Sequence, residues 1–128
     1  MPRVFLVGAL IGAMLWGATP LAHSQQTTEI YIPIGQSPGL SGKVTIIGTV
    51  EVVDSQARTV SVLGPAGSWR TVVTDRTKIW LDKSKQRLSN QTGSISDLRR
   101  GGLVEVKYVD GERRSGGPAD WIKVQLTQ

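Results

Sequence analysis

The stretch that decides the fold is SISDLRRGGLVEVKYV, residues 94–109. Its first half begins like a helix, because Ser94 and Asp97 have the spacing of a capping box. The glycine pair at 101–102 ends that segment. From residue 103 to 109 apolar and polar side chains alternate, which is the period of a strand with one buried face. The stretch therefore predicts a short helix of one to two turns followed directly by a strand.

Three strands are predicted upstream of this helix. They cover Val44–Val53, Arg58–Leu63 and a third segment, Trp69–Leu81, which is interrupted near Asp75. The turn residues between these segments are of the types that connect neighbouring strands. Gly48 within the first strand predicts a bulge or a bend, a feature that curls a sheet into a barrel.

The alternation assigns side chains to the two faces of each strand. In the first strand we expect Val44, Ile46, Gly48, Val50 and Val52 to face inward. The strand after the helix places Val104, Val106 and Tyr108 inward and leaves Glu105 and Lys107 on a solvated face. In the last strand, Ala119–Leu126, the inward residues are Ile122, Val124 and Leu126, and the outward ones are Trp121, Lys123 and Gln125.

The order of elements is three strands, a short helix and two strands. This order is that of the OB-fold, a small Greek-key barrel with its helix between strands three and four. We therefore predict a mainly β protein, a five-to-six-stranded OB-like barrel. An SH3-like barrel and a small open sandwich remain as alternatives.

Several segments resemble the recurrent segments of small exported bacterial families with OB-like barrels, many of them domains of unknown function. These segments are GKVTIIGTVEVVD, TVSVLG, TDRTKIWLD, SDLRRGGLVEVKY and ADWIKVQ, and together they span about residues 43–125. The resemblance implies a barrel fold and an exported protein. It carries no catalytic residues over to this chain.

The first 24 residues have the features of a secretory signal peptide. Arg3 precedes an apolar and glycine-rich run, Val4–Ala18, and small residues precede a cleavage site between Ser24 and Gln25. A membrane anchor is the alternative, but this run of about 15 residues is shorter than the roughly 20 that span a bilayer. We expect a periplasmic or secreted bacterial protein with no transmembrane segment after cleavage.

Cleavage leaves a chain in which residues 25–42 form a flexible or extended arm and residues 43–128 form the barrel domain. The arm is rich in proline and glycine, which break regular structure, although Glu29–Ile34 could run extended. The domain is dominated by valine and isoleucine, whose branched side chains favour strands.

The composition excludes most enzyme chemistry. Of the 128 residues none is cysteine, and the only histidine, both methionines and the only phenylalanine lie in the first 24. A Ser-His-Asp triad, a thiol centre, a haem site and the usual zinc sites therefore cannot form in the cleaved chain. We expect no cofactor, no metal site and no enzyme activity. A minimal hydrolase built on two carboxylates is the less favoured alternative.

Aromatic residues are the candidates for contact with a partner. Strand parity points Trp80 and Trp121 away from the core, Trp69 opens a strand after a turn, and Tyr31 lies in the arm. Exposed tryptophans commonly anchor protein and sugar contacts. The alternative is that the arm folds back and covers one of the tryptophans.

Basic residues gather in two predicted loops and are candidates for binding an anion. One group is Lys83, Lys85 and Arg87, and the other is Arg113 and Arg114, in the loop between the last two strands. Acidic glycan or lipopolysaccharide are the expected ligands, and export argues against nucleic acid. The alternative is ordinary solvated loop charge. The favoured hypothesis is an exported, non-enzymatic binding or assembly module that contacts an envelope protein or glycan.

Overall fold

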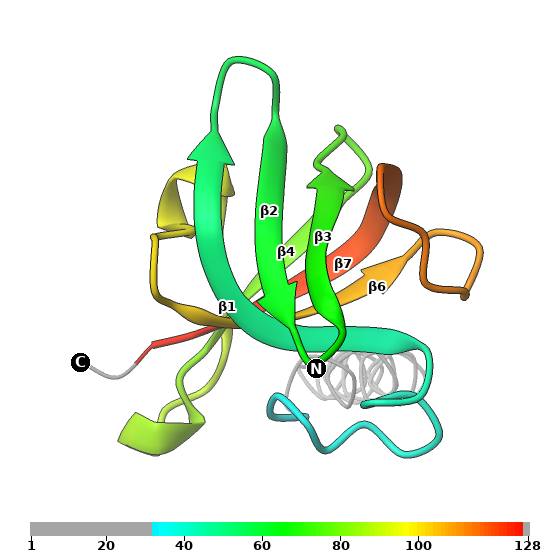
Figure 1. The fold of residues 1–128 in the computed structure, drawn as a ribbon. Coiled ribbons are helices and arrows are strands. Elements are labelled where there is room, and N and C mark those ends of the chain that lie inside the picture. Colours follow the sequence, from blue (N-terminus) through cyan, green and yellow to red (C-terminus); the bar gives the residue numbers. More distant parts are fainter. Residues whose placement is uncertain (1–31, 127–128) are drawn as a thin grey trace, which may run out of the picture. The chain divides into compact units, whose positions relative to one another are not determined.

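The computed structural model describes residues 32–126, which form a mainly β domain (Figure 1). Seven strands and two single-turn 3-10 helices, η2 and η3, follow one another along the chain. Their bounds are β1 (Thr45–Asp54), β2 (Thr59–Gly64), β3 (Gly67–Val72), β4 (Lys78–Asp82), η2 (Ser84–Gln86), β5 (Gln91–Thr92), η3 (Ile95–Asp97), β6 (Leu103–Tyr108) and β7 (Gly117–Gln125). Within these residues there is no helix with the length and apolar character needed to cross a membrane.

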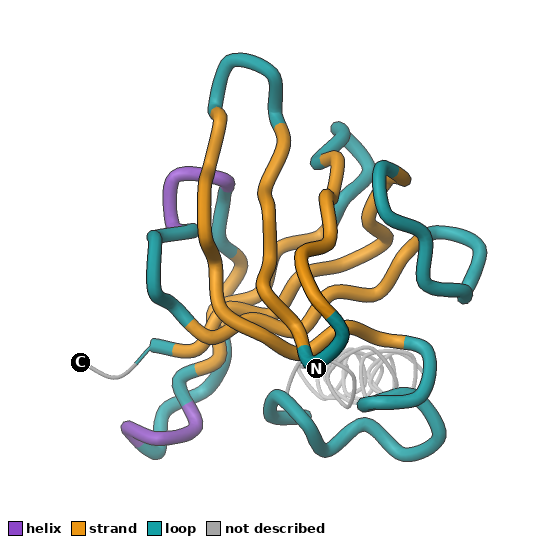
Figure 2. Tube along the Cα trace, in the orientation of Figure 1, coloured by secondary structure: helices purple, strands orange, loops and turns teal. Residues whose placement is uncertain are grey.

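The sheet closes on itself as a five-stranded barrel. β1 pairs with β2, β2 with β3, β6 with β1, and β7 with β6, all antiparallel. The parallel pairing of β3 with β7 closes the ring. Figure 2 shows the strands wrapping around a common interior. The predicted OB-like barrel is confirmed, and the SH3-like barrel and the open sandwich are wrong.

The predicted third strand is present in two pieces, as its interruption suggested. β3 and β4 both run parallel to β7, with Thr71 opposite Gly117 and Lys78 opposite Trp121. Thr77 fixes the break between them, because its hydroxyl donates to the carbonyl of Ala119, 2.7 Å away. β5 adds a short edge to β4.

Gly48 lies where β1 bends between the part that pairs with β6 and the part that pairs with β2. Residues 45–49 pair with β6, and residues 49–54 pair with β2. A Cβ atom at Gly48 would collide with the carbonyl oxygen of Leu63, so only glycine allows this close approach. The predicted bend is confirmed, and Figure 1 shows β1 curving strongly.

The bulge that goes with this bend lies two residues farther along. The register of β1 against β2 shifts between Val50 and Val52. There Val50 bonds to the glycine pair through both backbone groups: its N–H donates to Gly102 and its carbonyl accepts from Gly101, at 2.9 and 2.8 Å. The extra residue reverses the alternation. The inward placement of Val52 is therefore wrong: Val52 is 59% exposed, and Val53 packs against the core.

The predicted helix is the single turn η3. The carboxylate of Asp97 accepts the Ser94 N–H at 2.8 Å, as in a capping box. Leu98 follows the turn and is buried. The glycine pair then ends the segment as expected, with Gly101 at a φ of 85° that disfavours other residues.

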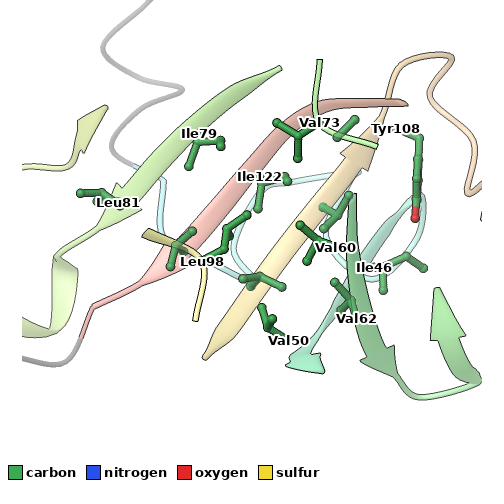
Figure 3. Packing of buried hydrophobic residues seen from close by; sticks show 14 residues of the cluster. Ile46, Val50, Val60, Val62, Val73, Ile79, Leu81, Leu98, Tyr108 and Ile122 are labelled. Carbon is green, nitrogen blue, oxygen red and sulfur yellow. The ribbon is translucent and has the colours of Figure 1, made fainter. Parts of the chain in front are cut away.

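The core consists mainly of branched side chains from β1, β2, β4, β6 and β7, together with Val73, which follows β3, and Leu98 (Figure 3). Tyr108 is the largest of its members, and its hydroxyl is 2.8 Å from that of Thr71 and donates to the carbonyl of Arg70. Burial raises the pKa of Tyr108 above its usual value, although the hydrogen bond with Thr71 acts in the opposite direction. The inward positions predicted for β6 and for Ile122 and Val124 in β7 are confirmed.

Candidate binding surfaces

The outer side of the barrel has two faces that differ in what lies over them. We call one the covered face, formed by the outward side chains of β4, β6, β7 and the start of β1. Residues 32–44 lie against it as a series of turns, in contrast to the flexible or extended arm that was predicted. Glu29 to Tyr31 and the predicted signal peptide lie outside the described residues.

Glu105 is the central polar group of the covered face. It is fully buried, and its carboxylate accepts three hydrogen bonds: from the Gly35 N–H at 2.9 Å, the Ser41 hydroxyl at 2.6 Å and the Thr45 hydroxyl at 2.8 Å. A buried carboxylate is tolerated only with such partners. The predicted solvated position of Glu105 is therefore wrong. Its hydrogen bonds attach the arm to β6.

Lys123 and Asp82 hold the arm at two further points. The Lys123 ammonium donates to the carbonyl of Ile32 at 2.9 Å and to the hydroxyl of Ser37 at 3.1 Å. The Asp82 carboxylate accepts the N–H of Ile34 at 2.8 Å. Lys123 is opposite Glu105 in the β6–β7 register. The arm is thus attached through three buried polar side chains on the outside of the barrel.

Trp121 lies on the covered face and is only 3% exposed. Strand parity correctly predicts that it points away from the core, but the prediction of an exposed Trp121 is wrong. The ammonium of Lys123, which is bonded to the arm, lies 4.7 Å from the centre of its ring. The arm folds back on the barrel, as in the alternative prediction, and Lys123 links it to Trp121. Trp80 is partly exposed beside Lys123, and Trp69 is partly buried against the core.

The second face is the open face, formed by the outward side chains of β1, β2 and β3. Its central residues are Val52 and Leu63, which are 59% and 47% exposed. Arg70, opposite Ser61, and Arg100, beyond η3, are exposed next to them. A shallow hollow of about 550 Å³ lies here, lined in part by Glu51, Val52, Ser61, Ser68 and Arg100. This face was not predicted from the sequence, because the alternation of side chains along the first strand assigned Val52 to the inward side.

The structure separates the two predicted groups of basic residues. Lys83, Lys85 and Arg87 lie in and around η2, whereas Arg113 and Arg114 lie in the β6–β7 loop on the other side of the domain (Figure 1). Lys83 donates to Gln91 at 2.9 Å, and Arg114 pairs with Asp110 at 3.5 Å. They do not form one rim, so each loop has to be considered as a separate surface.

Arg113 instead lies beside one of the predicted aromatic residues. A slot of about 190 Å³ opens between the β2–β3 turn and the start of β1, and both Trp69 and Arg113 line it. We call it the Trp69 slot. The two residues are 44 positions apart, so their proximity is a product of the barrel closure. Within residues 32–126 no group of three acidic, histidine or cysteine side chains is placed to hold a metal ion.

Comparisons with known proteins identify no family for this chain. No family model matches it, and no curated protein matches its sequence. Among solved structures, a tryptophan-to-alanine variant of CusF from Escherichia coli with Cu(II) is similar at 14% identity and a TM-score of 0.45, covering 65% of this chain and 91% of that chain. CusF with Ag(I) is similar at 16% identity and a TM-score of 0.42, covering 63% and 95%. Likeness at this level transfers no ligand to this chain.

Proposed function

We propose that this protein is an exported, non-enzymatic binding module whose open face contacts a protein of the bacterial envelope. The observation that carries the proposal is the difference between the two outer faces. The protein's own chain covers the face of β4, β6 and β7, while the face of β1, β2 and β3 presents Val52 and Leu63 to solvent. Exposed apolar side chains gathered on one surface are typical of an interaction site.

The chemistry of the open face favours an acidic partner with an apolar centre. Val52 and Leu63 supply the apolar contact, and Arg70 and Arg100 supply positive charge beside it. Glu51 carries one opposing formal charge, and its carboxylate accepts a hydrogen bond from Ser68 at 2.7 Å, so the two arginines leave these three side chains with a net positive charge. Arginine beside apolar residues is a common composition for the centre of a protein interface.

The carboxylates that could have served a hydrolase have structural partners. Glu105 and Asp82 hold the arm, Asp97 caps η3, and Asp54 accepts two backbone N–H groups in the β1–β2 turn. A group engaged in this way is poorly suited to exchange protons with a substrate. This arrangement supports a binding role over catalysis.

Site-directed photocrosslinking in the native host tests the proposed surface. A photoreactive residue at position 52 or 63 is expected to capture a discrete partner. Leu88 and Val109 provide matched controls, because they are 56% and 50% exposed but lie in loops outside the strands of the open face. Capture at 52 and 63 should disappear when Arg70→Glu and Arg100→Glu are introduced. Equal capture at all four positions, or capture that survives the charge reversals, would contradict the open face as the interface.

Export is tested separately from the interface. We expect the protein recovered outside the cytoplasm to begin at Gln25, which N-terminal sequencing of the purified material would show. Recovery of a chain that still carries residues 1–24, or recovery only from the cytoplasm, would remove the envelope from the proposal. The crosslinking result would still stand, because it depends only on the barrel.

A further inference from the structure

The Trp69 slot has the size and walls of a site for one apolar group. Its volume of about 190 Å³ slightly exceeds the roughly 150 Å³ of a cavity known to hold a benzene ring. Apart from Arg113, its lining residues are Gly42, Thr45, Ile46, Ile47, Pro65, Ala66 and Trp69, most of them apolar. A partly buried tryptophan is well suited to pack against a ring or a branched chain.

Arg113 lines the same slot and is held in place by the backbone. Its Nε donates to the carbonyl of Thr45 at 3.2 Å, and its Nη2 donates to the carbonyl of Gly42 at 2.7 Å. Nε and Nη2 form one edge of the planar guanidinium group. A side chain fixed along that edge loses little further freedom when it binds an anion.

The other edge of the Arg113 guanidinium is available for a ligand. A guanidinium carries five N–H donors, of which the two carbonyls use two. Within residues 32–126, no other group accepts a hydrogen bond from this side chain. The end formed by Nη1 and Nη2 therefore has two parallel N–H groups, which is the arrangement that binds a carboxylate through both oxygens.

The geometry points to the Trp69 slot as a binding site for an apolar group, one ring or one branched chain in size, that carries a carboxylate. The apolar group lies against Trp69 between Ile47 and the β2–β3 turn, and Arg113 binds the carboxylate. Both the C-terminal residue of a polypeptide and a free small organic acid have this chemistry. The site is separate from the open face, so it does not depend on the proposed function.

Titration with 3-phenylpropanoate tests the site on the purified protein produced from the full chain. The indole N–H signal of Trp69, assigned with Trp69→Phe, is followed by NMR. We expect a saturable shift with a dissociation constant on the order of 1 mM, which is ordinary for a ligand this small. The neutral 3-phenylpropan-1-ol should bind at least about tenfold more weakly, because it lacks the charge that Arg113 meets.

Two variants separate the two halves of the site. Arg113→Gln should weaken binding of 3-phenylpropanoate about tenfold, whereas Arg114→Gln, its neighbour outside the slot, should leave binding unchanged. Gly64→Ala keeps Arg113 but adds a Cβ 3.1 Å from Ile46 Cγ2 and 3.6 Å from Trp69 Cδ1, both at the slot. That methyl group should reduce binding about threefold or more.

The result has clear outcomes even if Arg113→Gln loosens the arm. The acid and alcohol are compared on the unaltered protein, and Gly64→Ala leaves the arm contacts in place. No shift of the Trp69 signal, or equal binding of acid and alcohol, overturns the site. N-acetylphenylalanine distinguishes the two sources: tighter binding of N-acetylphenylalanine than of 3-phenylpropanoate indicates a polypeptide C-terminus, and the reverse order indicates a free acid.

Discussion

The covered face and the open face belong to the same barrel but reverse the usual distribution of polar and apolar residues. On the covered face Glu105 and Lys123 are charged and fully buried. On the open face Val52 and Leu63 are apolar and about half exposed. The difference comes from residues 32–44, which supply hydrogen-bond partners to one face only. The exposure of an outward side chain on this barrel therefore depends on whether residues 32–44 lie over it, as well as on its position in the strand.

The tryptophans of β4 and β7 provide the largest expected contrast within the covered face. Trp121→Ala should lower the free energy of unfolding by about 4 kcal/mol, because a large buried side chain is lost. Trp80→Ala, which removes a partly exposed ring, should cost roughly 1 to 2 kcal/mol. Urea denaturation of both variants measures the two values. Equal costs would show that Trp121 is no better covered than Trp80.

The two glutamates on opposite faces test whether the polar contacts with the arm stabilise the fold. Glu105→Ala should cost about 3 kcal/mol, since it leaves the N–H and hydroxyl donors of the arm without their buried acceptor. Glu51→Ala removes a single contact with Ser68 on the open face and should cost roughly 0.5 kcal/mol. The same denaturation measurement applies. A small cost for Glu105→Ala would mean that water replaces the carboxylate and that the arm is only loosely attached.

Two cationic side chains, one on each face, should show a smaller difference in the free energy of unfolding. Lys123→Met preserves much of the side-chain volume but removes the donor to Ile32 and Ser37 and the charge opposite Glu105, at a cost of about 2 kcal/mol. Arg70→Met on the open face should stay within about 0.5 kcal/mol. Thermal unfolding followed by circular dichroism would reveal the difference. If both variants melted together, the buried position of Lys123 would contribute nothing to stability.

The smallest expected effect is on the open face itself. Val52→Thr combined with Leu63→Thr should change the free energy of unfolding by no more than about 0.5 kcal/mol, because both side chains are about half exposed and lie outside the core. A photoreactive residue at position 61, opposite Val52 on the open face, should capture the partner in the otherwise unaltered protein and lose it in this double variant. A substantial loss of stability would show that these residues support the barrel rather than an interface.

Much of the fold could be predicted because the evidence for it is local. The alternation of Val104, Val106 and Tyr108 with Glu105 and Lys107 reflects the two-residue period of a strand. This period is a property of the strand's own backbone and does not depend on which strands lie beside it. The glycine pair after η3 likewise marks its turn within a few residues. The prediction was wrong at Val52, since a bulge that reverses parity is stabilised by Gly101 and Gly102, about 50 residues away.

The candidate site was less accessible to prediction, because it depends on contacts between distant segments. Trp69 and Arg113 were each singled out for separate reasons, and only closure of the barrel places both at one slot. The exposure of Trp121 was predicted wrongly although its direction was right. Glu105 was placed on a solvated face because nothing near it in the chain indicates that Gly35 and Ser41 will bond to it.

By itself, the sequence determined the order of the elements, the direction in which most strand side chains point, and the absence of cysteine, histidine and methionine from residues 25–128. Local backbone geometry and composition are sufficient for these properties. Only the tertiary structure decided which outward side chains reach solvent and which residues share a surface. The reason is that burial on the outside of a barrel comes from a segment about 70 residues away in the chain, as in the bond between Gly35 and Glu105.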